Sequence, residues 1–221
     1  MQLSDILPVL GAGTWETLQM VLLSTLIGYV IGLPLGVLLT ISSRDGIAPN
    51  KFLYRTLDLI MNVTRSVPFL ILLILIQPLT KLVVGKSYGT TATIVPLTVA
   101  AAPLIARMVE NSLKEVDRGV IEAAISLGAG KMTIIRNVLI AEARTSLLVG
   151  VTIALGTILG YSAMAGIVGG GGLGDIAIRY GYYRYETEVM LITVAVLVLL
   201  MQLLQWIGMV LSRRIDRRRV A

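Results

Sequence analysis

Long stretches without any Asp, Glu, Lys or Arg residue divide this chain into apolar blocks. The blocks cover residues 17–43, 66–80, 87–106, 145–174 and 189–212. Because a helix rises about 1.5 Å per residue, about 20 apolar residues are needed to cross a hydrocarbon core of about 30 Å. Four blocks are long enough, and the block from Ser66 is long enough if it includes earlier residues such as Leu57 and Ile60. The pattern predicts an all-α membrane protein in one domain, 1–221, with five transmembrane helices at about 15–43, 53–80, 87–112, 144–168 and 187–212.

The composition agrees with a membrane protein. Of 221 residues, 56% are hydrophobic and 14% are charged, and the mean hydropathy is +0.85. A soluble domain has roughly 25% charged residues, so a soluble enzyme is excluded first. The chain has no Cys and no His. Thiolate chemistry and the commonest metal ligand and general base are therefore missing, and we expect no catalytic site, bound cofactor or metal.

Basic residues collect on one side of the predicted membrane. Four lie in 44–65, six in 107–144 and five from Arg213 onward, and the remaining four are Lys81, Lys86, Arg179 and Arg184. Cytoplasmic loops carry an excess of Lys and Arg, so the N-terminus is expected outside and the C-terminus in the cytoplasm. This bias accounts for the net charge of +6 better than nucleic-acid binding does. The basic tail is interpreted as an anchor at lipid headgroups.

The predicted spans contain residues that plain anchors do not need. The prolines within or at the edge of spans are Pro34, Pro68, Pro78, Pro96 and Pro103. Each removes a backbone hydrogen bond and favours a kink, as in a transporter or channel. Gly28, Gly32 and Gly36 repeat every fourth residue, which permits close helix contact. The alternative is ordinary packing within one bundle.

The longest cytoplasmic loop, about 113–143, is predicted to have structure of its own. Asp117 is suited to begin a helix, and Gly128 can adopt the left-handed conformation that ends one. Apolar residues recur between them at helical spacing, and a second short amphipathic helix is predicted from about Lys131. Periodicity alone would also fit a connector that rests on lipid headgroups.

Residues at the turn of this loop resemble a known signature. Glu122, Ala123 and Ala124, followed after three residues by Gly128, are similar to the EAA motif of bacterial ABC importer permeases. In that family this element is a coupling helix that docks into a groove on a cytoplasmic ATPase. The resemblance implies that these residues and Leu127 contact such an ATPase. Two alanines leave a narrow ridge, glycine permits a sharp turn, and the glutamate offers a carboxylate at the joint.

The chain departs from that signature at one position. Val138 and Ile140 match two aliphatic positions of the family pattern, but Ala141 stands where proline is usual. The resemblance therefore leaves open how sharply the chain turns from the second short helix into the fourth span.

Two further segments are similar to permease subunits of methionine ABC importers. They are PLTVAAAPLIARMVEN, which begins at Pro96, and GYSAM, which begins at Gly160. The resemblance covers most of the chain and implies a type I ABC importer permease fold in the bacterial inner membrane. It also implies a homodimeric pore, two ATPases that bind ATP and Mg²⁺, and an external lipoprotein that delivers L-methionine and, more weakly, D-methionine.

The same resemblance assigns Met164 to the gate of the pore. Gly156, Gly160 and Met164 are each four residues apart, so they are predicted to share one helical face. A face of two small residues and a flexible thioether would suit a closed dimer axis, although a methionine that fills a gap in the core is the alternative. Tyr161 and Ser162 are included as neighbours of the gate.

Two patterns that look like nucleotide chemistry are discounted. Gly169, Gly171 and Gly174 match GxGxxG, but no strand precedes them, as a dinucleotide site requires. This run is expected to be a flexible outer loop. Ile125 stands where a P-loop glycine should be, so any ATP that drives the protein must bind another chain.

A stand-alone secondary transporter is the main rival interpretation. Such carriers keep ionisable groups at midmembrane and show internal repeats. Asp58 and Arg65 are predicted to lie near the membrane surface and Glu110 at a helix end, which leaves no proton or ion relay. Within the importer class, a permease for another small amino acid or amine remains the alternative.

Overall fold

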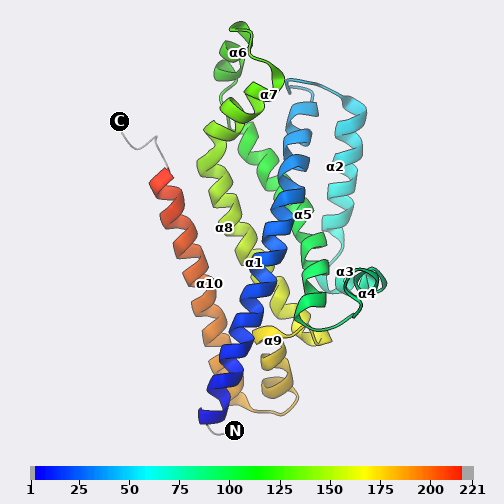
Figure 1. Ribbon diagram of the computed structural model, residues 1–221, viewed down its shortest axis with the longest axis vertical. Coiled ribbons are helices and arrows are strands. Elements are labelled where there is room, and N and C mark those ends of the chain that lie inside the picture. The colour runs from blue at the N-terminus through cyan, green and yellow to red at the C-terminus, as the bar shows by residue number, and fades with distance from the viewer. Residues whose placement is uncertain (1–2, 216–221) are drawn as a thin grey trace.

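Long helices that run along one axis dominate the structure (Figure 1). A computed structural model describes residues 3–215, and every regular element in that range is helical. The elements are α1 (Leu3–Ser42), α2 (Lys51–Ser66), α3 (Phe69–Leu75), α4 (Gln77–Val84), α5 (Thr90–Lys114), α6 (Arg118–Ser126), α7 (Lys131–Thr133), the π-helical η1 (Ile134–Leu139), α8 (Ile140–Ala165), the 3₁₀ turn η2 (Gly166–Val168), α9 (Gly172–Ile176), the π-helical η3 (Ala177–Tyr182) and α10 (Thr187–Ile215). The predicted all-α class is confirmed.

Four helical stretches within the described residues are long and apolar enough to cross a membrane. They are Ile6–Ser42, Thr90–Lys114, Lys131–Val168 and Thr187–Ile215. A fifth span exists if the bent pair α2 and α3 counts as one. The five predicted spans are therefore found if the bent pair is counted as one span. The first helix starts at Leu3, well before the expected start near residue 15. Pro8 lies between these positions, and the helix continues through it.

The second span is not the single helix expected over 53–80. The chain bends by 100° between α2 and α3. The residue before a proline is held away from the helical conformation, and Val67 has φ −78° and ψ 123° before Pro68. Pro68 itself is extended and starts α3, and Pro78 lies in the first turn of α4. As a result α3 and α4 lie across the long axis of the molecule (Figure 1).

Helices α1 and α5 form the most extensive helix-to-helix contact among the described elements. The repeated glycines of α1 lie in it. A Cβ atom added at Gly32 would lie 2.7 Å from the Ala102 carbonyl oxygen, and one at Gly36 would lie 2.6 Å from that of Ala106. Only hydrogen fits there, so α1 approaches the α5 backbone closely. The glycines thus serve packing within one bundle, which was the alternative interpretation.

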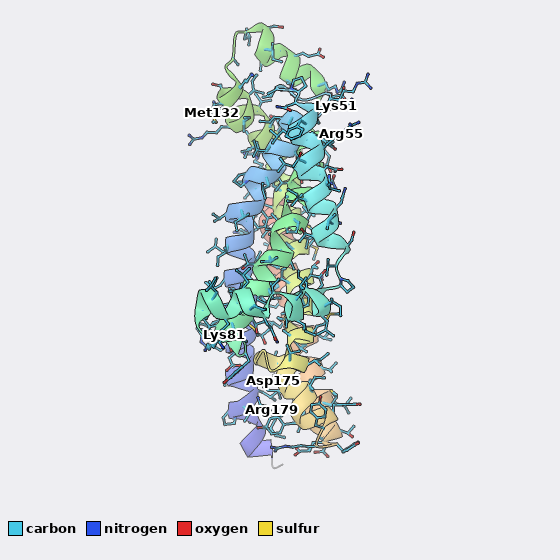
Figure 2. All side chains as sticks on the ribbon, turned by 90° about the vertical axis from the view of Figure 1, so that its right-hand side faces the viewer. Lys51, Arg55, Lys81, Met132, Asp175 and Arg179 are labelled. Carbon is cyan, nitrogen blue, oxygen red and sulfur yellow. The ribbon has the colours of Figure 1, made fainter. Side chains whose placement is uncertain are left out.

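The two ends of the bundle carry different loops. Helices α6 and α7 lie at one end, and the N-terminus and α9 lie toward the other (Figure 1). Lys51, Arg55 and Met132 lie at the first end, whereas Lys81, Asp175 and Arg179 lie in the opposite half (Figure 2). The segments expected on the cytoplasmic side are therefore gathered at one end. Three arginines of the basic tail, Arg217, Arg218 and Arg219, lie outside the described residues.

Candidate functional site

The predicted coupling segment is a short, well-capped helix. The Asp117 carboxylate accepts a hydrogen bond from the backbone N–H of Gly119 at 2.6 Å, so the predicted start of α6 is confirmed. The Ser126 hydroxyl donates to the Glu122 carbonyl at 3.0 Å in the last turn. None of the residues of α6 is buried. The helix therefore stands out from the bundle with most of its surface open.

Apolar residues dominate the open side of this segment. Leu127, which follows α6, is 88% exposed, and Ile125 is also exposed. Glu122, Ala123 and Gly128 are exposed as well. Ala124 instead packs against the core of the bundle together with Ile121. The exposed ridge is thus formed by Ala123 and Leu127, and the second alanine of the motif anchors the helix.

Gly128 makes the sharp turn that was predicted for it. Its φ is +78°, in the left-handed region. Its N–H donates to the Ile125 carbonyl at 2.9 Å, and the next N–H, of Ala129, donates to the Ala124 carbonyl at 3.0 Å. These bonds use carbonyl groups that the end of α6 would leave without helical partners. The turn holds Leu127 at the tip of the segment.

The second short helix of the loop is not separate from the fourth span. Helix α7 passes through the π-helical η1 directly into α8, and Lys131–Val168 forms one helical stretch of 38 residues. Ala141 lies within α8. Alanine keeps the backbone N–H that proline lacks, so no turn occurs where the family pattern has proline. The sequence left open how sharply the chain turns from the second short helix into the fourth span, and the structure shows a continuous helix there.

We predict that Gly128→Ala weakens transport and that Gly130→Ala does not. A Cβ at either glycine meets no atom within 4 Å, but only Gly128 has a positive φ. A left-handed alanine costs about 1–2 kcal/mol, which favours a rearranged turn. Uptake should fall several-fold for Gly128→Ala and stay unchanged for Gly130→Ala. Equal uptake by both variants would show that the turn is not needed.

Met164 lies on an open side of α8, as a gate residue requires. It is 49% exposed, and Gly160 is exposed one turn earlier. Gly156 differs, because a Cβ there would lie 2.8 Å from the Met201 Cε atom of α10. Each step of four residues rotates a helix by about 40°, so Gly156 and Met164 lie about 80° apart. The predicted common face of the three residues therefore holds only for Gly160 and Met164.

Two residues that the sequence reasoning missed extend this open side toward α6. Val149 and Ile153 are exposed and precede Gly160 and Met164 at helical spacing. In the sequence they look like any other apolar residues of the span. Only their exposure in the fold separates them from the buried Ala154 and Ile158.

Tyr161 and Ser162, the two expected neighbours of the gate, hold α8 in place. The Tyr161 ring stacks on the Phe69 ring of α3, with centroids 4.5 Å apart and an interplanar angle of 2°. Ser162 is buried, and its hydroxyl donates to the Leu159 carbonyl at 2.8 Å. Neither side chain shares the open side of Met164, and both contact other parts of the bundle.

The glycine run after the gate is tied down, contrary to the expected flexible loop. The Gly172 N–H donates to the Glu16 carboxylate at 2.7 Å, and the Leu173 N–H donates to the Thr17 hydroxyl at 2.9 Å. The Gly89 N–H donates to the Gly169 carbonyl at 2.9 Å. Helix α1 and the start of α5 thus bind this run from two sides, and its glycines are required by positive φ angles and close contacts.

A charged network inside the bundle was not foreseen. Glu110 is 1% exposed and pairs with Arg107 and Lys114, each at 2.6 Å. Arg107 also pairs with Asp58 of α2 and donates to Asn62 at 3.0 Å. Glu110 lies in the last turns of α5, at a helix end as expected, but its burial and its ion pairs were not predicted. The spacing of the three α5 residues was a usable signal. The pairing with α2 was not, because it depends on how the helices pack.

The family model described as "Binding-protein-dependent transport system inner membrane component" matches residues 28–220. The chain is also similar to two curated permeases. It is 50% identical over 210 residues to the "Probable D-methionine transport system permease protein MetI" of Vibrio cholerae serotype O1, covering 95% of this chain and 93% of that protein. It is 52% identical over 158 residues to the "D-methionine transport system permease protein MetI" of Escherichia coli strain K12, covering 72% and 73%.

Two solved structures have similar backbones. One is described as "Inward facing conformations of the MetNI methionine ABC transporter: CY5 native crystal form", with a TM-score of 0.96, 48% identity and coverage of 98% of this chain and 100% of that chain. The other, "Crystal structure of an amino acid ABC transporter with histidines", has a TM-score of 0.79 and 23% identity, with 96% of each chain covered. The second likeness concerns the fold alone.

Proposed function

The chain belongs to the family of binding-protein-dependent transport system inner membrane components, and we propose that it is the membrane-spanning permease subunit of an ATP-driven methionine importer. One observation carries this proposal, namely the likeness in sequence and backbone over nearly the whole chain to permeases of methionine transporters. Those relatives are named for D-methionine and methionine, so both enantiomers are candidate substrates. Another small amino acid is the alternative substrate.

The transport unit would contain more than this chain. A second copy would close the pathway against the open side of α8, and two ATPases would bind the exposed α6 segment. The chain has no phosphate-binding loop of its own, so ATP and Mg²⁺ belong to those partners. An external binding protein would deliver the amino acid. In this arrangement the α6 end of the bundle is cytoplasmic, and the N-terminus lies outside.

The fold supports a direct mechanical link between the ATPase and the gate. The stretch from Lys131 to Met164 is one helix, which begins three residues after the turn at Gly128. Over these residues the helix is roughly 50 Å long. Closure of the ATPases would pull on the α6 segment and tilt this long helix. A small rotation near α6 would then become a larger displacement at Met164, opening the pathway outward.

Uptake by the purified complex tests the proposal. The permease and its ATPase are placed in vesicles with the binding protein outside and ATP inside, and labelled L- and D-methionine are offered with unlabelled competitors. We expect uptake that requires ATP and is competed best by methionine. Preferential uptake of another amino acid would overturn the substrate, and uptake driven by an ion gradient without ATP would overturn the importer class.

We predict that Met164→Ala makes the pathway leaky. Removing the thioether side chain widens a constriction whose flanking residue is Gly160. Efflux of preloaded methionine without ATP should rise several-fold, while transport driven by ATP becomes less efficient. Met209→Ala on α10 is the matched control, because Met209 has the same exposed fraction, 49%. Equal leak from both variants would contradict the assignment of Met164 as the gate.

A further inference from the structure

Helix α2 has a polar side and an apolar side, and both are open. The polar side contains Lys51, Arg55, Asp58, Asn62 and Arg65, spaced by four, three, four and three residues. At about 100° per residue these positions fall within a sector of roughly 80°. The apolar residues Phe52, Leu59 and Val63 are exposed on a different side. Charged groups are costly in hydrocarbon, so the polar side must face water or protein, and only the apolar side suits lipid.

The most enclosed part of the polar side is the contact between Asp58 and Arg107. The Asp58 side chain is 34% exposed and that of Arg107 is 16% exposed. The Asn62 amide donates to the second Asp58 carboxylate oxygen at 3.2 Å, and its own oxygen accepts from Arg107. Glu110 holds the other terminal nitrogen of Arg107 from the buried side. The pair is therefore both accessible and held in place.

Along the long axis of the molecule, this pair lies between the α6 end and Met164. Arg107 precedes Lys114, the last residue of α5, by about 10 Å of helix. Ser146 of α8 donates to Ser112 of α5 at 2.9 Å, which sets the two helices level with each other. Met164 then lies about 27 Å further along α8, toward the opposite end. An amino acid that passes Met164 inward would reach the level of Arg107 before leaving.

We infer that the polar side of α2 lines the cytoplasmic half of the translocation pathway, and that Arg107 and Asp58 there bind the carboxylate and ammonium groups of the passing amino acid. This inference rests on the proposed import function. A guanidinium matches a carboxylate with two parallel hydrogen bonds, and a carboxylate accepts from an ammonium group. Glu110 keeps Arg107 in position when Asp58 turns toward the substrate.

Charge balance explains why the site would prefer a zwitterion. Asp58 and Glu110 carry two negative charges, and Arg107 and Lys114 carry two positive charges. A zwitterion has both charges and leaves this balance unchanged. At this four-residue network, a cation or an anion alone would leave one unpaired charge, which is unfavourable. The contact is to the head group, so it does not depend on the side chain of the amino acid.

Single cysteines test the position of the polar side. The chain has no native cysteine, so each variant carries one thiol. Asn62→Cys and Arg65→Cys are placed on the polar side, and Leu59→Cys and Val63→Cys are matched controls on the apolar side. In the complete complex in lipid, an anionic thiosulfonate should label the polar-side thiols at least ~10-fold faster, because it does not enter hydrocarbon. Equal labelling, or faster labelling of the controls, would overturn the inference.

Protection of the Asn62→Cys thiol tests the head-group contact. Millimolar glycine and methionine, both zwitterions, should slow labelling several-fold, whereas methionine methyl ester, a cation, should not. Substituting Arg107→Gln in the same background should remove the protection. No slowing by either zwitterion, or equal slowing by the ester, would overturn the contact. If glycine protects but methionine is not taken up by the wild-type complex, the proposed substrate fails and this site stands.

Discussion

Leu127→Asp is expected to abolish uptake while the protein remains folded in the membrane. Leu127 is 88% exposed at the tip of the coupling segment, and its side chain contributes nothing to the core. A large apolar residue in so open a position is suited to a groove on a partner. Burial of an aspartate at this position on docking would be costly, because a buried charge needs a partner. Loss of one interface hot spot costs about 2 kcal/mol or more, which is roughly a 30-fold loss of affinity.

Two measurements distinguish lost docking from misfolding. The ATPase should no longer co-purify with Leu127→Asp, whereas the yield of the variant in mild detergent should equal that of the wild type. Met132→Asp is the control, because Met132 lies at the same end of the molecule and is 73% exposed. If both variants lose the ATPase equally, added negative charge at this end is responsible, and the docking role of Leu127 is contradicted.

Gly36→Val is expected to prevent stable folding. A Cβ at Gly36 would lie 2.6 Å from the Ala106 carbonyl oxygen and 2.6 Å from the Val109 Cβ atom, so α1 must move away from α5. Both contacts are with atoms near the backbone, which cannot turn aside. Overpacking of this kind costs about 3 kcal/mol. The effect should be large, because α1 and α5 form the main contact of the bundle.

Gly11→Val serves as the matched control for this change. Gly11 lies in the same helix, and a Cβ there meets no atom within 4 Å. Thermal unfolding in detergent should show a large decrease in stability for Gly36→Val and little change for Gly11→Val. A similar loss in both variants would mean that valine disfavours α1 itself and that the contact with α5 is not the cause.

The local structure of the α6 segment was predicted well because its determinants are local. The start at Asp117 and the left-handed turn at Gly128 depend on residues only a few positions away. The common face of Gly156, Gly160 and Met164 was predicted less well. Helical spacing grouped Gly156 with Met164, but Met201 of α10 covers Gly156 and leaves Met164 open. Which side of a span stays open depends on the neighbouring helices, and spacing within one helix does not contain that information.

The charged residues also divide into features that the sequence predicted and features that depend on helix packing. The distribution of Lys and Arg predicted which loops lie at the same end of the molecule, because loops on the cytoplasmic side of a membrane are rich in these residues. The pairing of Asp58 with Arg107 was hidden, because these residues are far apart in the chain and meet only when α2 packs on α5. Read alone, Asp58 was expected near the membrane surface, and nothing in the sequence indicated Arg107 as its partner.

The sequence by itself determined the helical class, the number of apolar segments and the capped turn at Gly128, because helix length, hydropathy and capping depend on neighbouring residues. The bend of the second span also has a local cause, because Pro68 holds Val67 in an extended conformation. The tertiary structure alone decided two other features. It buried Glu110 between two cations, and it covered Gly156 with Met201 while it left Met164 open. Both depend on which surfaces the other helices cover, and a charge that they bury needs a partner.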